Sequence, residues 1–85
     1  MSLSLRRKLE EASELCRVPQ EIIIHFIEER WISPVDVEHR MLDEEDVARV
    51  QLIWELKQEF GVNDEAIPLI LHLIDQLNLM HLRLK

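Results

Sequence analysis

The chain contains one glycine, one cysteine and no tyrosine among its 85 residues, and each scarcity excludes something. The lone cysteine, Cys16, excludes an internal disulfide and the paired-cysteine spacing of a zinc finger. The lone glycine, Gly61, excludes a glycine-rich phosphate loop, and no nucleophile-elbow sequence is present. Helix-forming residues occur in every segment, so this composition predicts a mainly helical protein that is not an enzyme.

Metal ligands and long apolar runs are scarce as well. The chain has four histidines: His25, His39, His72 and His81. No two of them lie three or four residues apart, so we expect no metal site and no cofactor. No run of about 18 apolar residues exists, so we expect no membrane span. The first ~30 residues lack the apolar segment of a secretory leader, which favours a cytoplasmic protein.

The charge is acidic and unevenly placed. The chain has 17 acidic and 10 basic residues, for a net charge of −7. Residues 19–62 hold 11 of the acids and 4 of the bases. Such a segment repels a nucleic-acid backbone and attracts a basic partner. A chain of this length has a thin core, so we expect one small domain, 1–85, that benefits from self-association.

Residues 4–30 have the pattern of a helix-turn-helix. Ser4 is a suitable cap for a first helix, whose apolar residues recur at helical spacing. Pro19 follows a short break and suits the first turn of a second helix. Residues 31–42 interrupt the helical pattern and predict a small wing. The two segments expected to form its hairpin are 32–35 and 39–42.

A third helix is predicted at 43–60 and a long C-terminal helix at 64–84. Asp43 is a good N-cap with further acids behind it, and Gly61 is a helix stop. The last helix has more apolar surface than one stripe packed on the domain can use. We therefore expect a homodimer; the alternative is that this surface packs entirely on the first and third helices. The expected dimer interface is Ile70, Ile74, Leu77, Met80, His81 and Leu84.

The order of helix-turn-helix, wing, acid-capped helix, glycine and long helix resembles a MerR-type winged-helix module. Local motifs resemble a narrower family, the bacterial chaperone modulators called CbpM. They are ERWISP at 29–34, LDEEDVAR at 42–49, FGVN at 60–63 and LILHLIDQL at 69–77. The resemblance covers about residues 13–80. Three residues depart from the family pattern, because Arg17 replaces a turn glycine, Pro19 a capping serine or threonine, and Pro68 a small helical residue.

The resemblance implies a protein-binding function. Members of that family bind the J-domain of a DnaJ-like co-chaperone of the CbpA type. They prevent it from stimulating a DnaK-type chaperone and oppose its DNA binding. J-domains present a basic helix, which suits the acidic middle of this chain. The expected partner-binding residues are Glu28, Glu29, Trp31, Asp36, Glu38 and Glu44.

Some of these residues have a second interpretation. Glu44 belongs to an acidic cluster that also caps a helix, and Trp31 is either a binding anchor or part of the core. The alternative function is a MerR-like DNA-binding transcriptional regulator. In that class the second helix reads bases, but here it offers only Gln20 and Arg30 for the task, so we do not expect specific DNA binding.

Overall fold

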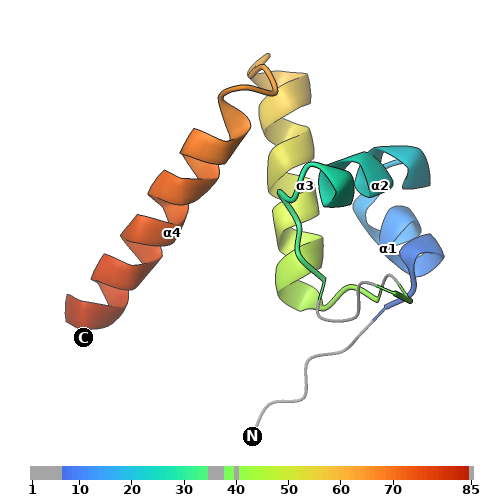
Figure 1. Ribbon diagram of the computed structural model, residues 1–85, viewed down its shortest axis with the longest axis horizontal. Helices are drawn as coiled ribbons and strands as arrows, with labels where there is room; N and C mark the ends of the chain where they lie inside the picture. Colours follow the sequence, from blue (N-terminus) through green and yellow to red (C-terminus); the bar gives the residue numbers. More distant parts are fainter. Residues whose placement is uncertain (1–6, 35–37, 40, 85) are drawn as a thin grey trace, which may run out of the picture.

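The fold is mainly helical, as predicted. The computed structural model describes residues 7–34, 38–39 and 41–84, and only the backbone of 82–84. The helices within these residues are α1 (Leu9–Cys16), α2 (Gln20–Glu28), α3 (Glu44–Glu59) and α4 (Ile67–Leu84). Figure 1 shows α1 and α2 on one flank of α3, while α4 starts near the C-terminal end of α3 and diverges from it. The molecule is consequently flat, with extents of 38 × 37 × 20 Å.

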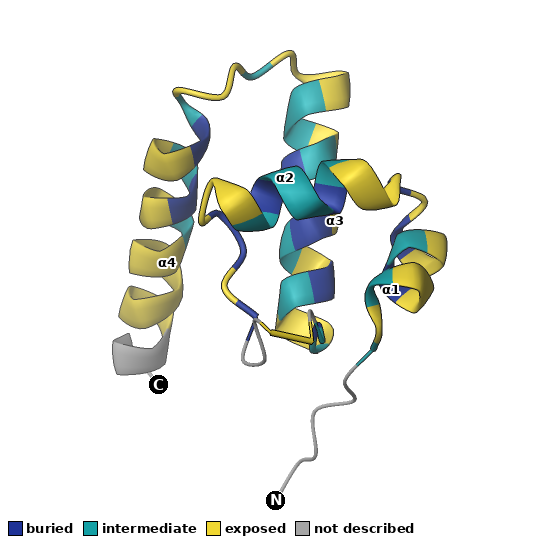
Figure 2. Ribbon diagram, turned by 45° about the vertical axis from the view of Figure 1, so that its right-hand side comes forward, coloured by how far each residue is buried: buried dark blue, intermediate teal, exposed yellow. Residues whose placement is uncertain are grey.

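The core lies where α1, α2 and α3 meet. Figure 2 shows the buried parts of these helices facing inward, whereas most of α4 is exposed. The largest fully buried side chains are Phe26, Ile23, Ile32, Leu42, Ile53, Ile67, Val18 and Val50. Burying a side chain of this kind stabilises the fold by about 1.5–3 kcal/mol relative to leaving it exposed. The helical spacing of these residues determines which face of each helix turns inward.

An arginine in the left-handed backbone region lies just after each of the helices α1 and α2. Arg17 has a φ of 59° and Arg30 a φ of 63°. This region favours glycine, because glycine has no Cβ to clash with the backbone. In each case the next backbone N–H, of Val18 or Trp31, donates to the carbonyl oxygen five residues earlier, at 3.2 and 3.0 Å. These Schellman-type ends turn the chain sharply after each helix.

The start of α1 differs from the prediction. Lys8 is the N-cap residue, and its backbone N–H donates to the Glu11 carboxylate at 3.4 Å. Ser4, the predicted cap, lies outside the described residues. Arg7 and Leu42 form an isolated antiparallel bridge, with N–H···O distances of 2.7 and 2.8 Å. This bridge ties the entry of α1 to the entry of α3.

The predicted wing falls partly outside the described residues, because 35–37 and 40 hold the middle of the expected hairpin. The described part of 31–42 contains no β-strand. The backbone N–H and carbonyl oxygen of Leu42 bond to Arg7, two residues before α1 begins. In the described residues, segment 31–42 therefore serves as a connection from α2 to α3.

Local chemistry sets the ends of α3 and the start of α4. Asp43 accepts a hydrogen bond from the backbone N–H of Asp46 at 2.9 Å, and Asp46 accepts one from Asp43 at 3.1 Å. The predicted Asp43 cap is therefore confirmed as a capping box. Gly61, with a φ of 63°, confirms the predicted stop after α3. Asn63 caps the following turn, and Pro68 lies in the first turn of α4, where its missing N–H is tolerated.

Only the first half of α4 packs on the domain. Ile67 is fully buried and Leu71 is 5% exposed. Further along the same side of the helix, Ile74 is half-buried and Asn78 is exposed. Exposure rises along this face because α4 diverges from α3 (Figure 1). The divergence creates the surfaces described next.

Candidate protein-binding surfaces

The acids predicted to bind a partner lie on two parts of the surface. Glu28 is the last residue of α2 and Glu29 is its C-cap, whereas Glu44 begins α3 and Glu38 lies in the preceding connection. All four are exposed. Figure 1 places the end of α2 part-way along α3, away from the N-terminal end of α3. The structure therefore does not gather the four acids into one cluster, and Asp36 lies outside the described residues.

Trp31 is a core residue, and its burial does not support its predicted role as a contact residue. Trp31 is only 6% exposed. Its ring centroid lies 5.5 Å from that of Phe26 and 5.7 Å from that of His25, and Lys57 Nζ lies 5.8 Å from the Trp31 ring. An apolar contact back onto the last turn commonly accompanies a Schellman end, and the Trp31–Phe26 contact fills that role. As folded, Trp31 offers a partner little surface.

A polar junction links α2, α3 and the turn before α4. Lys57 of α3 donates a hydrogen bond to one carboxylate oxygen of Asp64. His25 Nε2 of α2 lies 3.7 Å from the other oxygen. The hydrogen bond from Lys57, more than the proximity of His25, lowers the pKa of Asp64. These side chains are partly exposed, so the junction orients the turn more than it stabilises the fold.

The predicted dimer residues fall into two groups on α4. Leu77 is 64% exposed and Met80 is 56% exposed, and His81 is exposed as well. Ile70 and Ile74 are half-buried instead, because they lie nearer the face that packs on the domain. The side chain of Leu84 is outside the described part of the chain.

Sequence reasoning missed two residues of the exposed apolar face. Leu69 is 60% exposed and Leu73 is 52% exposed. They precede Leu77 at intervals of four residues, so helical spacing alone groups them with it. We define the outer stripe of α4 as Leu69, Leu73, Leu77 and Met80. Within the described residues nothing covers this stripe.

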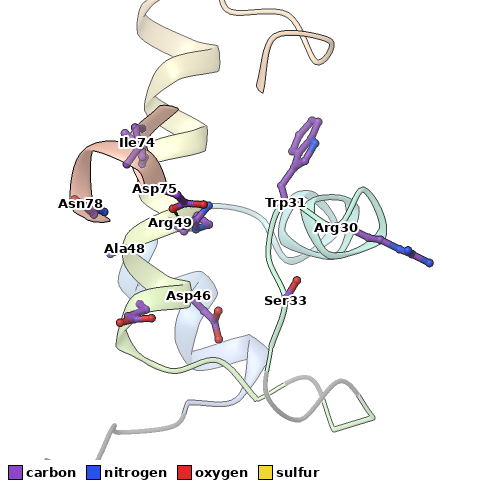
Figure 3. A pocket seen from close by; sticks show the side chains of 11 residues that line it. Arg30, Trp31, Ser33, Asp46, Ala48, Arg49, Ile74, Asp75 and Asn78 are labelled. Carbon is purple, nitrogen blue, oxygen red and sulfur yellow. Dashed lines mark hydrogen bonds and ion pairs between the residues drawn. The ribbon is translucent and has the colours of Figure 1, made fainter. Parts of the chain in front are cut away.

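A groove of about 650 Å³ opens between α3 and α4. We call it the α3–α4 groove, and sequence reasoning did not predict it. It is lined by Arg30, Trp31, Ser33, Glu45, Asp46, Ala48, Arg49, Leu52, Ile74, Asp75 and Asn78. Figure 3 shows Arg49 of α3 and Asp75 of α4 meeting across it, and their side chains form an ion pair at 2.7 Å. The groove thus has walls from α3, α4 and the segment after α2.

Cys16 is a buried core residue. It is 8% exposed, and its thiol donates to the backbone carbonyl oxygen of Val47 at 3.7 Å. Burial raises the pKa of the Cys16 thiol, which keeps the sulfur protonated and unreactive. No group of metal-ligating side chains occurs among the described residues.

The second helix of a helix-turn-helix is the element that reads bases in the major groove, and here that element is α2. Its exposed residues are Gln20, Glu21 and Glu28, followed by the exposed cap Glu29. Three carboxylates on this surface oppose a phosphate backbone, whose affinity for proteins comes from lysine and arginine contacts. The exposed surface of α2 is therefore suited to a cationic partner.

Comparison with known proteins assigns the chain at the level of a family. A family model described as "MerR HTH family regulatory protein" matches residues 8–85 and so includes all four helices. No curated protein and no solved structure gives a significant match. Among the described residues, none of the helices has the length and apolar character needed to cross a membrane.

Proposed function

The chain belongs to the MerR helix-turn-helix family of regulatory proteins, and on that premise we propose that its target is a protein. It binds the J-domain of a DnaJ-like co-chaperone of the CbpA type and blocks stimulation of a DnaK-type chaperone. The membership in a regulatory family agrees with the lack of catalytic motifs in the sequence. The motifs at 29–34, 42–49 and 60–77, which resemble the CbpM chaperone modulators, supply the specific partner.

The observation that carries this proposal is the exposed acidic surface at α2. Glu21, Glu28 and Glu29 are exposed where a DNA-binding relative needs cations. Glu28 and Glu29 have no ion pair within the described residues, so their charge is available to a partner. Opposite charges across such a surface accelerate association and select the partner more than they increase affinity. Glu38 and Glu44 extend the proposed contact set toward the start of α3, and Asp36 belongs to the set from the sequence alone.

The direct test measures binding of the purified chain to an isolated J-domain, together with the J-domain's stimulation of DnaK ATPase activity. We expect binding and inhibition by the wild type. The double variant Glu28→Lys with Glu29→Lys should weaken binding at least about tenfold, because two attractive charges become repulsive. A matched control, Glu10→Lys with Glu14→Lys, makes the same charge change on exposed positions of α1. Equal losses in both variants, or none, would remove α2 as the contact surface.

A MerR-like DNA-binding regulator is the alternative function, and the family assignment is the finding that keeps it in view. One pull-down from lysate separates the two functions. Retention of a J-domain protein without DNA supports the proposal. Retention of specific DNA fragments without a J-domain protein would replace it with the alternative.

We also propose that the protein is a homodimer built on the outer face of α4. The outer stripe supplies exposed apolar surface that the described residues do not cover, with Ile70, Ile74 and His81 at its edges. Leu84 belongs to the proposed interface from the sequence alone. Sedimentation at micromolar concentration should give twice the chain mass of 10.2 kDa. Leu77→Lys should shift the species toward monomer, whereas His72→Lys, at an exposed position of α4 about 95° around the helix from the centre of the stripe, should not. A compact wild-type monomer contradicts the dimer.

A further inference from the structure

The α3–α4 groove widens toward a mouth at the second half of α4, where the two helices diverge (Figure 1). Before the groove, α4 packs on the core through the buried Ile67 and Leu71. Toward the mouth the same face of α4 presents Ile74, and α3 presents Leu52, both half-buried. The face of α4 that is buried in the first half of the helix is therefore uncovered in the second half. A third helix can pack into this groove, with its axis about 8–10 Å from the axis of each helix that it contacts.

The charge of the groove is negative at its mouth. Glu45 and Asp46 of α3 line it, and Glu45 is exposed without an ion pair among the described residues. Neither lining arginine neutralises them. Arg49 is paired with Asp75, and Figure 3 shows the Arg30 side chain pointing away from the groove.

Asp46 gives a second indication of uncompensated negative charge. Partial burial, followed by the neighbouring Asp43 carboxylate, raises the pKa of Asp46. A cation close to Asp46 would stabilise its charged form and relieve this repulsion. The mouth of the groove therefore lacks the positive charge that would complement it.

We propose that the α3–α4 groove is the docking site for a basic amphipathic helix of a partner protein. The apolar side of that helix packs on Leu52 and Ile74, beside the small side chain of Ala48. Its lysine or arginine side chains lie beside Glu45 and Asp46. An apolar stripe fitted into a groove with complementary charges at the rim is a common mode of helix recognition. The inference rests on the proposed function, because a J-domain presents a helix of this kind. It differs from that proposal in placing the main contact in the α3–α4 groove.

A second copy of the chain is not needed to fill the groove. At 100° per residue, the centre of the outer stripe lies about 140° around α4 from the face that lines the groove. A dimer built on the stripe therefore reaches the groove only at Ile74, which lies at the edge of both surfaces, and leaves the α3 wall of the groove open. The two surfaces can be occupied at the same time, one by each kind of partner.

The test compares two variants with the same change in net charge. The groove variant is Glu45→Lys with Ala48→Arg; both positions are exposed and line the groove. The control is Glu55→Lys with Gln51→Arg, at exposed positions of α3 that do not line it. Neither pair includes a buried or capping residue, and circular dichroism and thermal unfolding verify the fold. The probes are an isolated J-domain, a designed basic amphipathic helical peptide, and an acidic peptide with the same apolar residues.

We expect the J-domain and the basic peptide to bind the wild type and the control within about twofold of each other. Binding to the groove variant should be at least about tenfold weaker, because added cations and bulk oppose the helix. The acidic peptide should not bind. Equal loss in the groove variant and the control means a general charge effect and overturns the groove.

Failure of the groove and failure of the proposed function give different results. If Glu28→Lys with Glu29→Lys abolishes J-domain binding while the groove variant binds normally, the groove is wrong and the proposed function stands. If the basic peptide binds in the groove and the J-domain does not bind at all, the groove stands and the proposed partner is wrong. If neither probe binds the wild type, both are wrong. A groove variant that loses only self-association assigns the groove to a second copy and overturns the proposal.

Discussion

The aromatic rings of Phe26 and Trp31 lie 5.5 Å apart and close the C-terminal end of α2. The backbone N–H of Trp31 also donates to the carbonyl oxygen of Phe26 at 3.0 Å, so one residue pair provides both the polar and the apolar contact of the helix end. Lys57 adds a cation–π contact from α3 at 5.8 Å. Trp31 therefore joins α2 to α3, and its value to the protein is structural.

The Trp31→Ala variant should lose about 3–5 kcal/mol in free energy of unfolding, because it leaves a cavity in a thin core. Trp31→Phe keeps a ring against Phe26 and should lose less than half as much. Urea denaturation of the two variants measures the difference. A Trp31→Ala variant as stable as wild type would show that the residue does not hold α2 to the core. It would restore Trp31 as a candidate contact for a partner.

Arg17→Gly should stabilise the protein by about 1 kcal/mol, because glycine adopts a φ of 59° without the steric cost of a Cβ. For a domain of this size, that gain corresponds to a rise in melting temperature of about 4–8 °C. Arg17→Ala is the matched control, since it removes the same charge and keeps the Cβ. A gain in both variants would trace the effect to charge, and no gain in Arg17→Gly would contradict the backbone argument.

The features that sequence predicted correctly are those set by neighbouring residues. Asp43 with Asp46, and Gly61 after α3, act within one turn of their own helix, so spacing and residue type were sufficient. Arg17 and Arg30 in the left-handed region were not predictable in the same way, because arginine does not favour that region locally and the chain turns there to bury the next residues, Val18 and Trp31. The α3–α4 groove depends on the angle at which α4 leaves the turn at 61–66. That angle follows from contacts between residues far apart in the chain, such as His25 with Asp64.

Cys16 should react with a thiol reagent only as fast as the protein opens. Its sulfur is buried, donates to the Val47 carbonyl oxygen, and has a raised pKa, so little thiolate is present near neutral pH. Labelling with a chromogenic disulfide should be slow in buffer and fast in denaturant. Fast labelling in buffer would mean that the α1–α3 contact opens readily.

Stability in acid should depend on Asp64. Its folded-state pKa is lowered by Lys57 first and by His25 to a smaller extent. A lowered carboxyl pKa stabilises the fold above the unfolded value, about 3.9, and that contribution disappears as the pH falls through the folded value. Asp64→Asn should therefore lower the melting temperature slightly near neutral pH, and the difference from wild type should shrink as the pH falls below about 4, through the lowered folded-state pKa of Asp64. A difference that is constant over the whole range would exclude titration of Asp64 as the cause.

The outer stripe of α4 makes the order of this helix depend on what covers it. Only the first half of the 18-residue helix packs on the described residues, and the second half alone is shorter than the ~12–15 residues below which an isolated helix is marginal in water. Whatever covers the stripe does so by mass action, so its contribution to stability grows with the concentration of the covering molecule. The second half of α4 should consequently fray at high dilution and become ordered as the covering molecule accumulates. For the proposed homodimer the covering molecule is a second copy, so the amount of the protein would then set the fraction of chains that present a complete fourth helix.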